Sequence, residues 1–242
     1  LMEKVRRSLL APAVAETRVI ANGVDRAVFR PADRLGARIG AGLPQDALIL
    51  LFVASSIRRN PWKDWQTLRA AVARASEVPH ARPLLFVALG EQAPPLRAGR
   101  AEIRFVPFEQ DPAAVARYYQ AADVYIHAAR ADTFPCTVLE ALACGTPVVA
   151  SAVGGIPEQV RSLGSPEAHQ PPLGADPTSA TGILVPCGDA ERMSAAITRL
   201  VADATLRRQL GENAATDARA RFDLHRQADA YLQWYEELLA RR

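Results

Sequence analysis

The chain is poor in lysine. Of its 29 lysine and arginine residues, all but Lys4 and Lys63 are arginine, and 26 aspartate and glutamate residues leave a formal net charge of only +3. Proteins that bind nucleic acid usually carry a strongly basic face. The charge balance therefore predicts no nucleic-acid partner, and it draws attention to Lys63 as the single lysine in the interior of the sequence.

Cysteine is scarce and irregularly spaced. The three cysteines, Cys136, Cys144 and Cys187, are odd in number and lack the spacing of metal ligands, so they suit neither a disulfide framework nor a metal cluster. The sequence also lacks an Asp-x-Asp pair that would hold a metal ion against a phosphate group. These absences predict a reducing, cytoplasmic location and no metal cofactor.

Long apolar runs are missing as well. No stretch reaches the roughly 18 residues needed to span a bilayer, and the N-terminus lacks an ordered signal-peptide pattern. The opening letters LMEKVRRSLLAPAVAE are typical of the end of a helix followed by a linker. Residues 1–17 are therefore predicted to be the remnant of an interdomain linker or of a preceding domain, and residues 18–242 to form one domain.

Buried strands alternate with amphipathic helices along the rest of the chain. A short strand and an Asn22-Gly23 turn are predicted near residue 18, and an exposed loop is predicted over residues 162–181. Further strands are predicted at residues 46–55, 82–91, 102–108, 123–129, 147–151 and 181–189, and helices at residues 63–76, 111–123, 135–144 and 155–163, followed by three C-terminal helices.

This alternation predicts an α/β fold with a Rossmann-like, doubly wound and mostly parallel sheet and a helical C-terminal tail. Its strands are nearly continuous apolar runs, as expected when helices cover both faces of a parallel sheet. Sheets of this type bind ligands beyond the carboxyl ends of their strands. Candidate functional residues are therefore expected in the loops that follow the strands.

The most informative stretch covers residues 130–158. Asp132 follows a predicted strand, and Glu140 comes after seven intervening residues, in the second turn of a helix opened by Pro135. Helical side chains lean toward the N-terminus of their helix, so both carboxylates are expected at one mouth. The free N–H groups near Cys136, Thr137 and Val138 lie between them and form a natural anion site.

A ligand with hydroxyl groups on either side of a phosphate suits this pattern, and a nucleotide sugar has that form. Glu140 is predicted to accept hydrogen bonds from the ribose diol and Asp132 from a hydroxyl of the sugar. Three cations in the loop after the first buried strand, Arg58, Arg59 and Lys63, are available to neutralise the diphosphate.

Simpler readings exist for each of these residues. By spacing alone Asp132 fits a helix-capping or loop acid, Glu140 a solvated helix residue, and Lys63 a surface lysine. A histidine on an apolar strand, such as His127, is more often a core residue than a catalyst.

The surrounding motif favours the functional reading. The segment DTFPCTVLEALACGTPVVASAVGGIPE resembles the signature of retaining glycosyltransferase family 4, which has the GT-B fold. The resemblance extends to NGVDRAVFRP, which is similar to the segment that enters the family's C-terminal domain, and to TGILVPCGDAERMSAAI, which is similar to its closing strand and helix. It implies that residues 18–242 are a GT-B C-terminal, nucleotide-sugar-binding domain.

The resemblance also implies roles for individual residues. It puts Asp132 where the family usually has a glutamate that contacts the donor sugar, Glu140 at the ribose-binding glutamate, and Lys63 at the lysine that binds the donor phosphates. Asp132 and Lys63 are thus the predicted catalytic residues. The positions at which the family's Gly-Phe-Gly stretch offers backbone amides to the donor are filled here by Phe134, Pro135, Cys136 and Thr137.

The sequence departs from the family pattern in three places. Asp132 is one methylene shorter than the usual glutamate, and Pro135 removes an N–H group where the family often has glycine. The loop from Ser55 to Trp62 does not match the family's Gly-Arg-Leu segment, which leaves open whether Ser55, Arg58 or Arg59 replaces its arginine.

The resemblance further implies transfer of a sugar from a nucleotide sugar to an acceptor hydroxyl with retention, in polysaccharide, glycolipid or glycoconjugate synthesis. The N-terminal Rossmann-like domain that supplies most of the acceptor site is absent from this sequence, so the isolated chain is expected to be inactive. Its final helix would then expose Trp234 and Tyr235. An acceptor glycan or a lipid-linked sugar is the expected partner, with contact at the inner membrane face in the second case.

Two other classes of protein remain open at this stage. One is a GT-B epimerase or phosphorylase, against which the Cys-Gly-Thr-Pro turn and the acid spacing argue. The other is a non-catalytic module that binds a nucleotide sugar, or a degenerate domain that only packs against a partner. The aspartate at position 132 and the altered phosphate loop keep this second class open.

Overall fold

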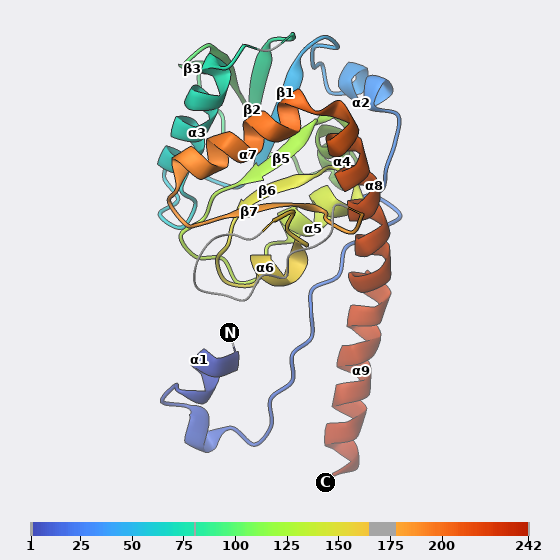
Figure 1. Cartoon of the computed structure of the whole chain (residues 1–242). Coiled ribbons are helices and arrows are strands. Elements are labelled where there is room, and N and C mark those ends of the chain that lie inside the picture. The colour runs from blue at the N-terminus through green and yellow to red at the C-terminus, as the bar shows by residue number, and fades with distance from the viewer. Residues whose placement is uncertain (1, 80, 165–177, 242) are drawn as a thin grey trace.

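The computed structural model describes residues 2–79, 81–164 and 178–241. One seven-stranded sheet forms its centre, with the strand order β3-β4-β2-β1-β5-β6-β7 (Figure 1). All neighbouring strands run parallel except the edge strand β3, which is antiparallel to β4. The strands are β1 (Leu48–Val53), β2 (Leu84–Leu89), β3 (Leu96–Ala98), β4 (Ala101–Val106), β5 (Val124–His127), β6 (Val148–Ser151) and β7 (Gly182–Val185).

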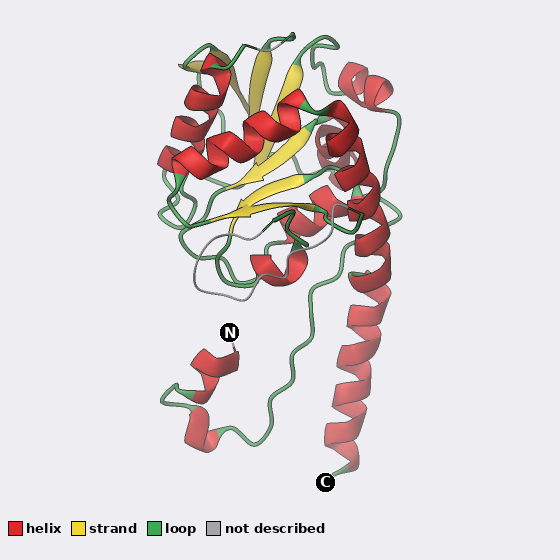
Figure 2. Ribbon diagram, viewed as in Figure 1, coloured by secondary structure: helices red, strands yellow, loops and turns green. Residues whose placement is uncertain are grey.

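Helices cover both faces of this sheet (Figure 2). The helices of the described residues are α1 (Met2–Arg6), the short 3-10 helix η1 (Ala11–Ala13), α2 (Arg34–Gly40), α3 (Trp65–Glu77), α4 (Pro112–Ala121), α5 (Cys136–Ala143), α6 (Ile156–Gln159), α7 (Ala190–Ala202), α8 (Ala204–Arg221) and α9 (Leu224–Ala240). The helices α3 and α7 pack on one face, while α2, α4 and α5 pack on the other.

The strand β1 explains why the apolar runs are continuous. Leu50 and Phe52 belong to the core cluster under α3 and α7, whereas Ile49 and Leu51 belong to the cluster on the opposite face. Successive side chains of a strand alternate between faces, so a strand covered on both faces must be apolar throughout. The predicted α/β class and mostly parallel sheet are confirmed.

Local signals placed several helix ends correctly. Asp111 caps α4 by accepting a hydrogen bond from the Ala113 amide at 3.0 Å, and Pro112 occupies the first helical position, within the helix predicted at residues 111–123. Asp64 likewise caps α3, and Asp189 caps α7. These caps fix where each helix starts after the loop that follows a strand.

Four predicted or overlooked elements need correction. The described residues before Asn22 form no strand, and Val19 is 66% exposed. The strand-like pairing nearby is an isolated bridge between Val24, after the Asn22-Gly23 pair, and Asp223. The predicted helix at residues 155–163 stops at Gln159, because Leu163 instead donates to the Gly182 carbonyl at 2.7 Å, beside β7. The helix α2 and the three-residue strand β3 were not predicted.

The glycine of the Asn22-Gly23 pair is needed for a reason other than the predicted turn. Gly23 does not adopt a positive φ; instead, a Cβ there would lie 2.5 Å from the Cα of Leu224. The glycine is needed because the chain passes tightly against the start of α9. Most of the loop predicted over residues 162–181 lies outside the described residues, which resume at residue 178.

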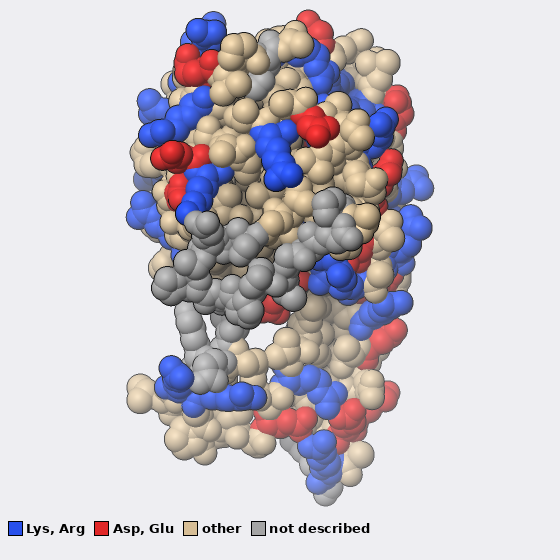
Figure 3. Space-filling view, viewed as in Figure 1, with Lys and Arg blue, Asp and Glu red and all other residues tan. Residues whose placement is uncertain are grey.

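The last helix, α9, extends away from the sheet and has no buried residue (Figure 1). Tyr235 is 54% exposed, as expected, but Trp234 is half-buried because the Arg18 guanidinium lies 5.6 Å from its ring centroid. None of the helices formed by the described residues is both long and apolar enough to cross a bilayer. Basic and acidic side chains are interspersed over the face seen in Figure 3.

Candidate functional site

The predicted site lies where the strand order reverses direction. From β1 the chain proceeds to β2 and β4 on one side, then returns to β5 on the other side of β1. In such folds the usual ligand position is the crevice at the carboxyl edge of the sheet, beside the loops that follow these two strands. Lys63 belongs to the first loop and Asp132 to the second.

Backbone pairing between these loops holds Lys63 in place. Lys63 forms an isolated antiparallel bridge with Ala129, just beyond the end of β5. On either side of it, the Arg130 amide donates to the Trp62 carbonyl at 2.9 Å and the Asp64 amide donates to the Ala128 carbonyl at 3.1 Å. The lysine is thus fixed by the sheet extension and does not depend on its own long side chain for its position.

Asp132 contacts two other ionisable side chains, those of Lys63 and His127. The ammonium group of Lys63 lies 2.5 Å from Oδ2 of Asp132, and Nε2 of His127 lies 3.3 Å from the same oxygen. The other ring nitrogen of His127, Nδ1, is 3.0 Å from the Tyr125 hydroxyl. A neutral imidazole that donates from Nε2 to Asp132 and accepts from Tyr125 satisfies both contacts.

The electrostatics favour an ionised aspartate. Burial alone would raise the pKa of Asp132, but hydrogen bonds from His127 and Lys63 outweigh burial and lower the pKa to about 2. Burial also lowers the pKa of the His127 imidazole, which is fully buried, and Asp132 only partly offsets this effect. At neutral pH the cluster therefore contains one carboxylate, one ammonium group and one neutral histidine.

Two glycines hold the loop that carries Asp132. Gly154 has a φ of +56°, and a Cβ there would lie 1.6 Å from the Asp132 carbonyl oxygen. A Cβ on Gly155 would lie 2.2 Å from the carbonyl oxygen of Thr133. The Gly-Gly-Ile-Pro-Glu segment thus lets two backbones meet without an intervening side chain.

The start of α5 is fixed by side chains from distant elements. Asn22 donates to the Phe134 carbonyl at 3.1 Å, and Gln159 donates to the Pro135 carbonyl at 3.1 Å. Pro135 is the N-cap residue, and the helix begins at Cys136. Both donors act on the carbonyl groups that precede the helix, so they orient its first turn toward the crevice.

The set of amides predicted for anion binding becomes smaller. The Val138 amide donates to the Pro135 carbonyl at 3.2 Å and its side chain is fully buried, so the prediction of a free N–H group at Val138 is wrong. Because the first N–H groups of a helix point out of its N-terminal end, Cys136 and Thr137 remain as the amides suited to an anion. Phe134 and Pro135 help to fix the start of α5 through their carbonyl groups, which accept the hydrogen bonds from Asn22 and Gln159.

Glu140 lies in the second turn of α5, as predicted, and has a buried partner. The Tyr119 hydroxyl donates to Oε2 of Glu140 at 2.7 Å. Burial raises the pKa of Glu140, and the Tyr119 hydrogen bond partly opposes that rise. Tyr119 belongs to α4, and the Thr146 hydroxyl helps to hold it by donating to its carbonyl group at 2.7 Å.

The remaining predicted residues lie in the loop after β1. Ser55 and Arg59 are exposed. Arg58 is engaged elsewhere: its Nε lies 2.6 Å from a Glu91 carboxylate oxygen, and its guanidinium group lies 5.1 Å from the Phe105 ring centroid. A phosphate bound by Arg58 would therefore share its guanidinium group with Glu91, and the role of Arg58 stays a prediction.

Sequence reasoning missed the supporting residues. His127 was interpreted as a core histidine, and it is fully buried, yet its ring also contacts Asp132. Its position as the last residue of β5 was the available signal, because that end of the strand opens into the crevice. Tyr119, Asn22 and Gln159 carried no local signal, since their partners lie at least 21 positions away.

Together the fold and the site define a doubly wound α/β domain in which the N-terminus of a helix lies between two acidic groups. The model of the family "Glycosyl transferases group 1" matches residues 44–217, which is most of the chain. The chain belongs to this family, and its relatives are glycosyltransferases.

Relatives and solved structures agree with this assignment. D-inositol 3-phosphate glycosyltransferase of Saccharomonospora viridis is 32% identical over 238 residues, which cover 92% of this chain and 50% of the relative. Sucrose-phosphate synthase from Thermosynechococcus elongatus is 30% identical, with a TM-score of 0.77, and the match covers all of this chain and 57% of that one. The chain spans about half the length of the curated relatives it matches.

One solved neighbour contains ligands. The structure of Anabaena Alr3699/HepE in complex with UDP and glucose aligns with 91% of this chain and 57% of its own, with a TM-score of 0.69 and 19% identity. At this level of identity the likeness shows a shared fold.

Proposed function

We propose that this chain is the donor-binding half of a retaining glycosyltransferase of family 4 and that it binds a nucleotide sugar. The observation that carries the proposal is the position of Asp132 and Glu140 before and within the first turns of α5, with Lys63 held beside Asp132 by backbone pairing. Family membership supports it, and so does the fold neighbour whose structure was determined with UDP and with UDP-glucose.

Each group has one role in this proposal. Glu140 accepts hydrogen bonds from the ribose hydroxyls, because Tyr119 occupies Oε2 and leaves Oε1 for the ligand. The amides of Cys136 and Thr137, together with Lys63, bind the diphosphate. Asp132 accepts a hydrogen bond from a hydroxyl of the donor sugar, while His127 keeps that carboxylate oriented.

The reaction follows from these roles. The bond between the anomeric carbon and the phosphate oxygen breaks, the acceptor hydroxyl oxygen bonds to the same carbon, and the hydroxyl proton passes to the leaving diphosphate or to solvent. The nucleoside diphosphate leaves with the bonding electrons, and its growing negative charge is stabilised by Lys63 and the N-terminus of α5. Because these groups supply the positive charge, we propose that donor binding needs no metal ion.

The rest of the activity depends on sequence outside this chain. We propose that an N-terminal Rossmann-like domain of the same protein supplies the acceptor site, since the chain covers about half of its curated relatives. The acceptor would be a glycan or a lipid-linked sugar, and a lipid-linked one would bring a cytoplasmic enzyme to the inner membrane face. Relatives named as D-inositol 3-phosphate glycosyltransferases make a phosphorylated cyclitol a further acceptor to assay.

Calorimetric titration of UDP, GDP and ADP tests donor binding, first with a chelator and then with added Mg²⁺. One nucleotide is expected to bind without metal, and Glu140→Ala should weaken it by about 1–3 kcal/mol through loss of charge-assisted hydrogen bonds. Glu236→Ala is the matched control, because Glu236 is an exposed glutamate on α9.

Different outcomes separate the competing functions. Equal affinity of the Glu140→Ala and Glu236→Ala variants would refute the assigned ribose contact. If none of the nucleotides bound to this chain or to the full-length protein, the result would indicate a degenerate domain. Binding without sugar transfer by the full-length protein would favour a non-catalytic module, and product analysis would reveal an epimerase or a phosphorylase.

A further inference from the structure

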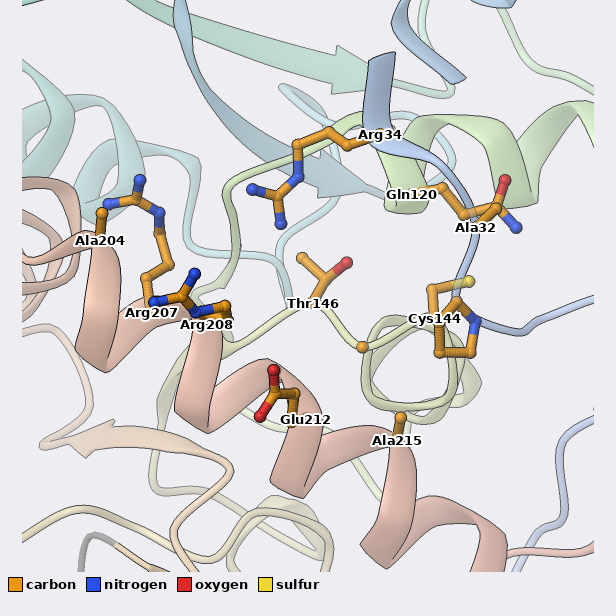
Figure 4. A pocket seen from close by; sticks show the side chains of 13 residues that line it. Ala32, Arg34, Gln120, Cys144, Thr146, Ala204, Arg207, Arg208, Glu212 and Ala215 are labelled. Atoms are coloured by element: carbon orange, nitrogen blue, oxygen red, sulfur yellow. The ribbon is translucent and has the colours of Figure 1, made fainter. Parts of the chain in front are cut away.

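A second cavity lies at the opposite edge of the sheet, near the amino ends of β5 and β6. It has a volume of about 420 Å³ and is bounded by α8, the start of α2 and the turn from Cys144 to Thr146 (Figure 4). Thr146 comes after the end of α5, whereas the candidate donor site lies at the start of that helix. The two regions are therefore separated by the length of α5.

Positive charge is concentrated next to this cavity. Four guanidinium groups lie within 4.0 Å of a single buried carboxylate, that of Asp123; the distances are 2.7 Å to Arg38, 3.4 Å to Arg34, 3.6 Å to Arg207 and 3.9 Å to Arg82. Four positive charges against one negative charge leave three in excess. The whole chain has a formal net charge of the same size, +3.

Part of this cluster is structural. Arg38 donates to Asp123 and to three backbone carbonyl groups, and Asp123 also accepts from the Ile49 amide at 2.8 Å. Burial lowers the pKa of Arg38 and of Arg207; attraction by Asp123 opposes this lowering, and repulsion from Arg34 and Arg82 adds to it. One buried carboxylate thus faces four guanidinium groups.

Two arginines of this cluster, Arg34 and Arg207, also line the cavity, and Arg208 adds a third guanidinium group to its wall. Arg34 extends from the start of α2, and Arg207 and Arg208 extend from α8 (Figure 4). Glu212, also on α8, is the one acidic side chain of the lining. Arg207 is almost fully buried, whereas the Arg34 side chain is 45% exposed and lies only at the long distance of 3.4 Å from Asp123. The wall therefore presents two net positive charges, and Arg34 and Arg208 can reorient toward a ligand.

We propose that this cavity binds a phosphomonoester group, with Arg34 and Arg208 as its main ligands and buried Arg207 behind them. Guanidinium groups match the oxygens of a phosphate in pairs, and a dianionic phosphate would balance the two net charges of the wall. The volume suits a small phosphorylated molecule, and the half-enclosed shape does not suit an extended polyanion.

Thermal unfolding with added inorganic phosphate tests the proposal, at constant ionic strength and with chloride as the reference anion. Phosphate should raise the Tm, and saturating UDP should not remove the effect, because the donor site lies elsewhere. Arg34→Gln/Arg208→Gln should weaken phosphate binding about tenfold or more, as expected for lost charge-assisted hydrogen bonds. Arg69→Gln/Arg97→Gln, which removes two exposed arginines elsewhere, should leave binding unchanged.

Three results would overturn the proposal, and a fourth measurement identifies the source of the phosphate group. An equal response of both double variants to phosphate, or an equal effect of chloride and phosphate, would overturn the proposal. Loss of the phosphate effect in Lys63→Gln but not in the Arg34 and Arg208 variant would also overturn it by assigning the anion to the donor site. Co-sedimentation with phosphatidic acid vesicles then identifies the source: binding that the Arg34 and Arg208 substitutions remove would assign the site to a lipid headgroup.

Discussion

The hydroxyl group of Tyr119 should set the pH range over which the proposed donor site binds a nucleotide. It donates to Glu140 at 2.7 Å in a buried environment, and burial raises the pKa of that carboxyl group. An ionised Glu140 accepts hydrogen bonds from a ribose more strongly than a protonated one, so affinity is highest above its folded pKa and declines as the pH falls through it. Tyr119→Phe removes the one hydrogen bond that opposes the raised pKa.

The expected size follows from the strength of that bond. A hydrogen bond to a charged group is worth about 1.5–3 kcal/mol, and one pKa unit corresponds to about 1.4 kcal/mol. The pH below which nucleotide affinity declines should therefore rise by roughly 1–2 units in Tyr119→Phe. At high pH, where Glu140 stays ionised in both proteins, the difference in affinity should be smaller.

Calorimetric Kd values for the best-binding nucleotide, measured from pH 5 to 8, test this prediction. Tyr118→Phe is the matched control, because Tyr118 is the neighbouring, half-buried tyrosine of the same helix. Profiles that coincide for all three proteins would refute the reasoning. A uniform loss of affinity without a change in the pH midpoint would show that Tyr119 only packs against α5.

Two further changes probe the loop that carries Asp132. Gly154→Ala should lower the free energy of unfolding by roughly 3 kcal/mol or more, because its Cβ meets the Asp132 backbone. Gly188→Ala is the control: Gly188 has a φ of +75° and no atom within 4 Å of the added Cβ, so the loss should be only about 1 kcal/mol. Similar losses for the two variants in urea titrations would contradict the proposed clash. The pKa of Asp132 is about 2 in the folded protein and 3.8 in the unfolded chain, so its carboxylate stabilises the fold above pH 3.8 by roughly 2 kcal/mol, and this contribution is lost as the pH falls toward about 2. Asp132→Asn should remove this pH-dependent contribution. Parallel acid unfolding of both proteins would argue against that contribution.

Much of the fold was predictable because its signals are local. The strands β1 and β2 are apolar on both faces, and the aspartates before α3, α4 and α7 mark helix starts. The edge strand β3 has only three residues, two of them exposed, so it has no periodicity to detect. Val19 and its neighbours looked like a strand from composition, but the structure places them outside the sheet, with Val19 66% exposed.

The site was predictable only in part, for a related reason. Asp132 and Glu140 could be located because both positions follow from one strand and one helix of known direction. The contacts of Tyr119 with Glu140 and of Arg58 with Glu91 depend on how separate helices and loops pack, and residue type alone does not indicate them. The amide of Val138 was misassigned because the exact first residue of a helix varies with its cap.

The crevice joins residues that are remote in the chain. Lys63 and Asp132 are 69 positions apart, and they meet only because β1 pairs with β5 after β2, β3 and β4 have been added on the other side. Closing so long a loop costs entropy before any contact repays it, so such pairings form late and slowly in folding. Ligand binding during refolding should therefore lag behind helix formation and report the moment when the centre of the sheet closes.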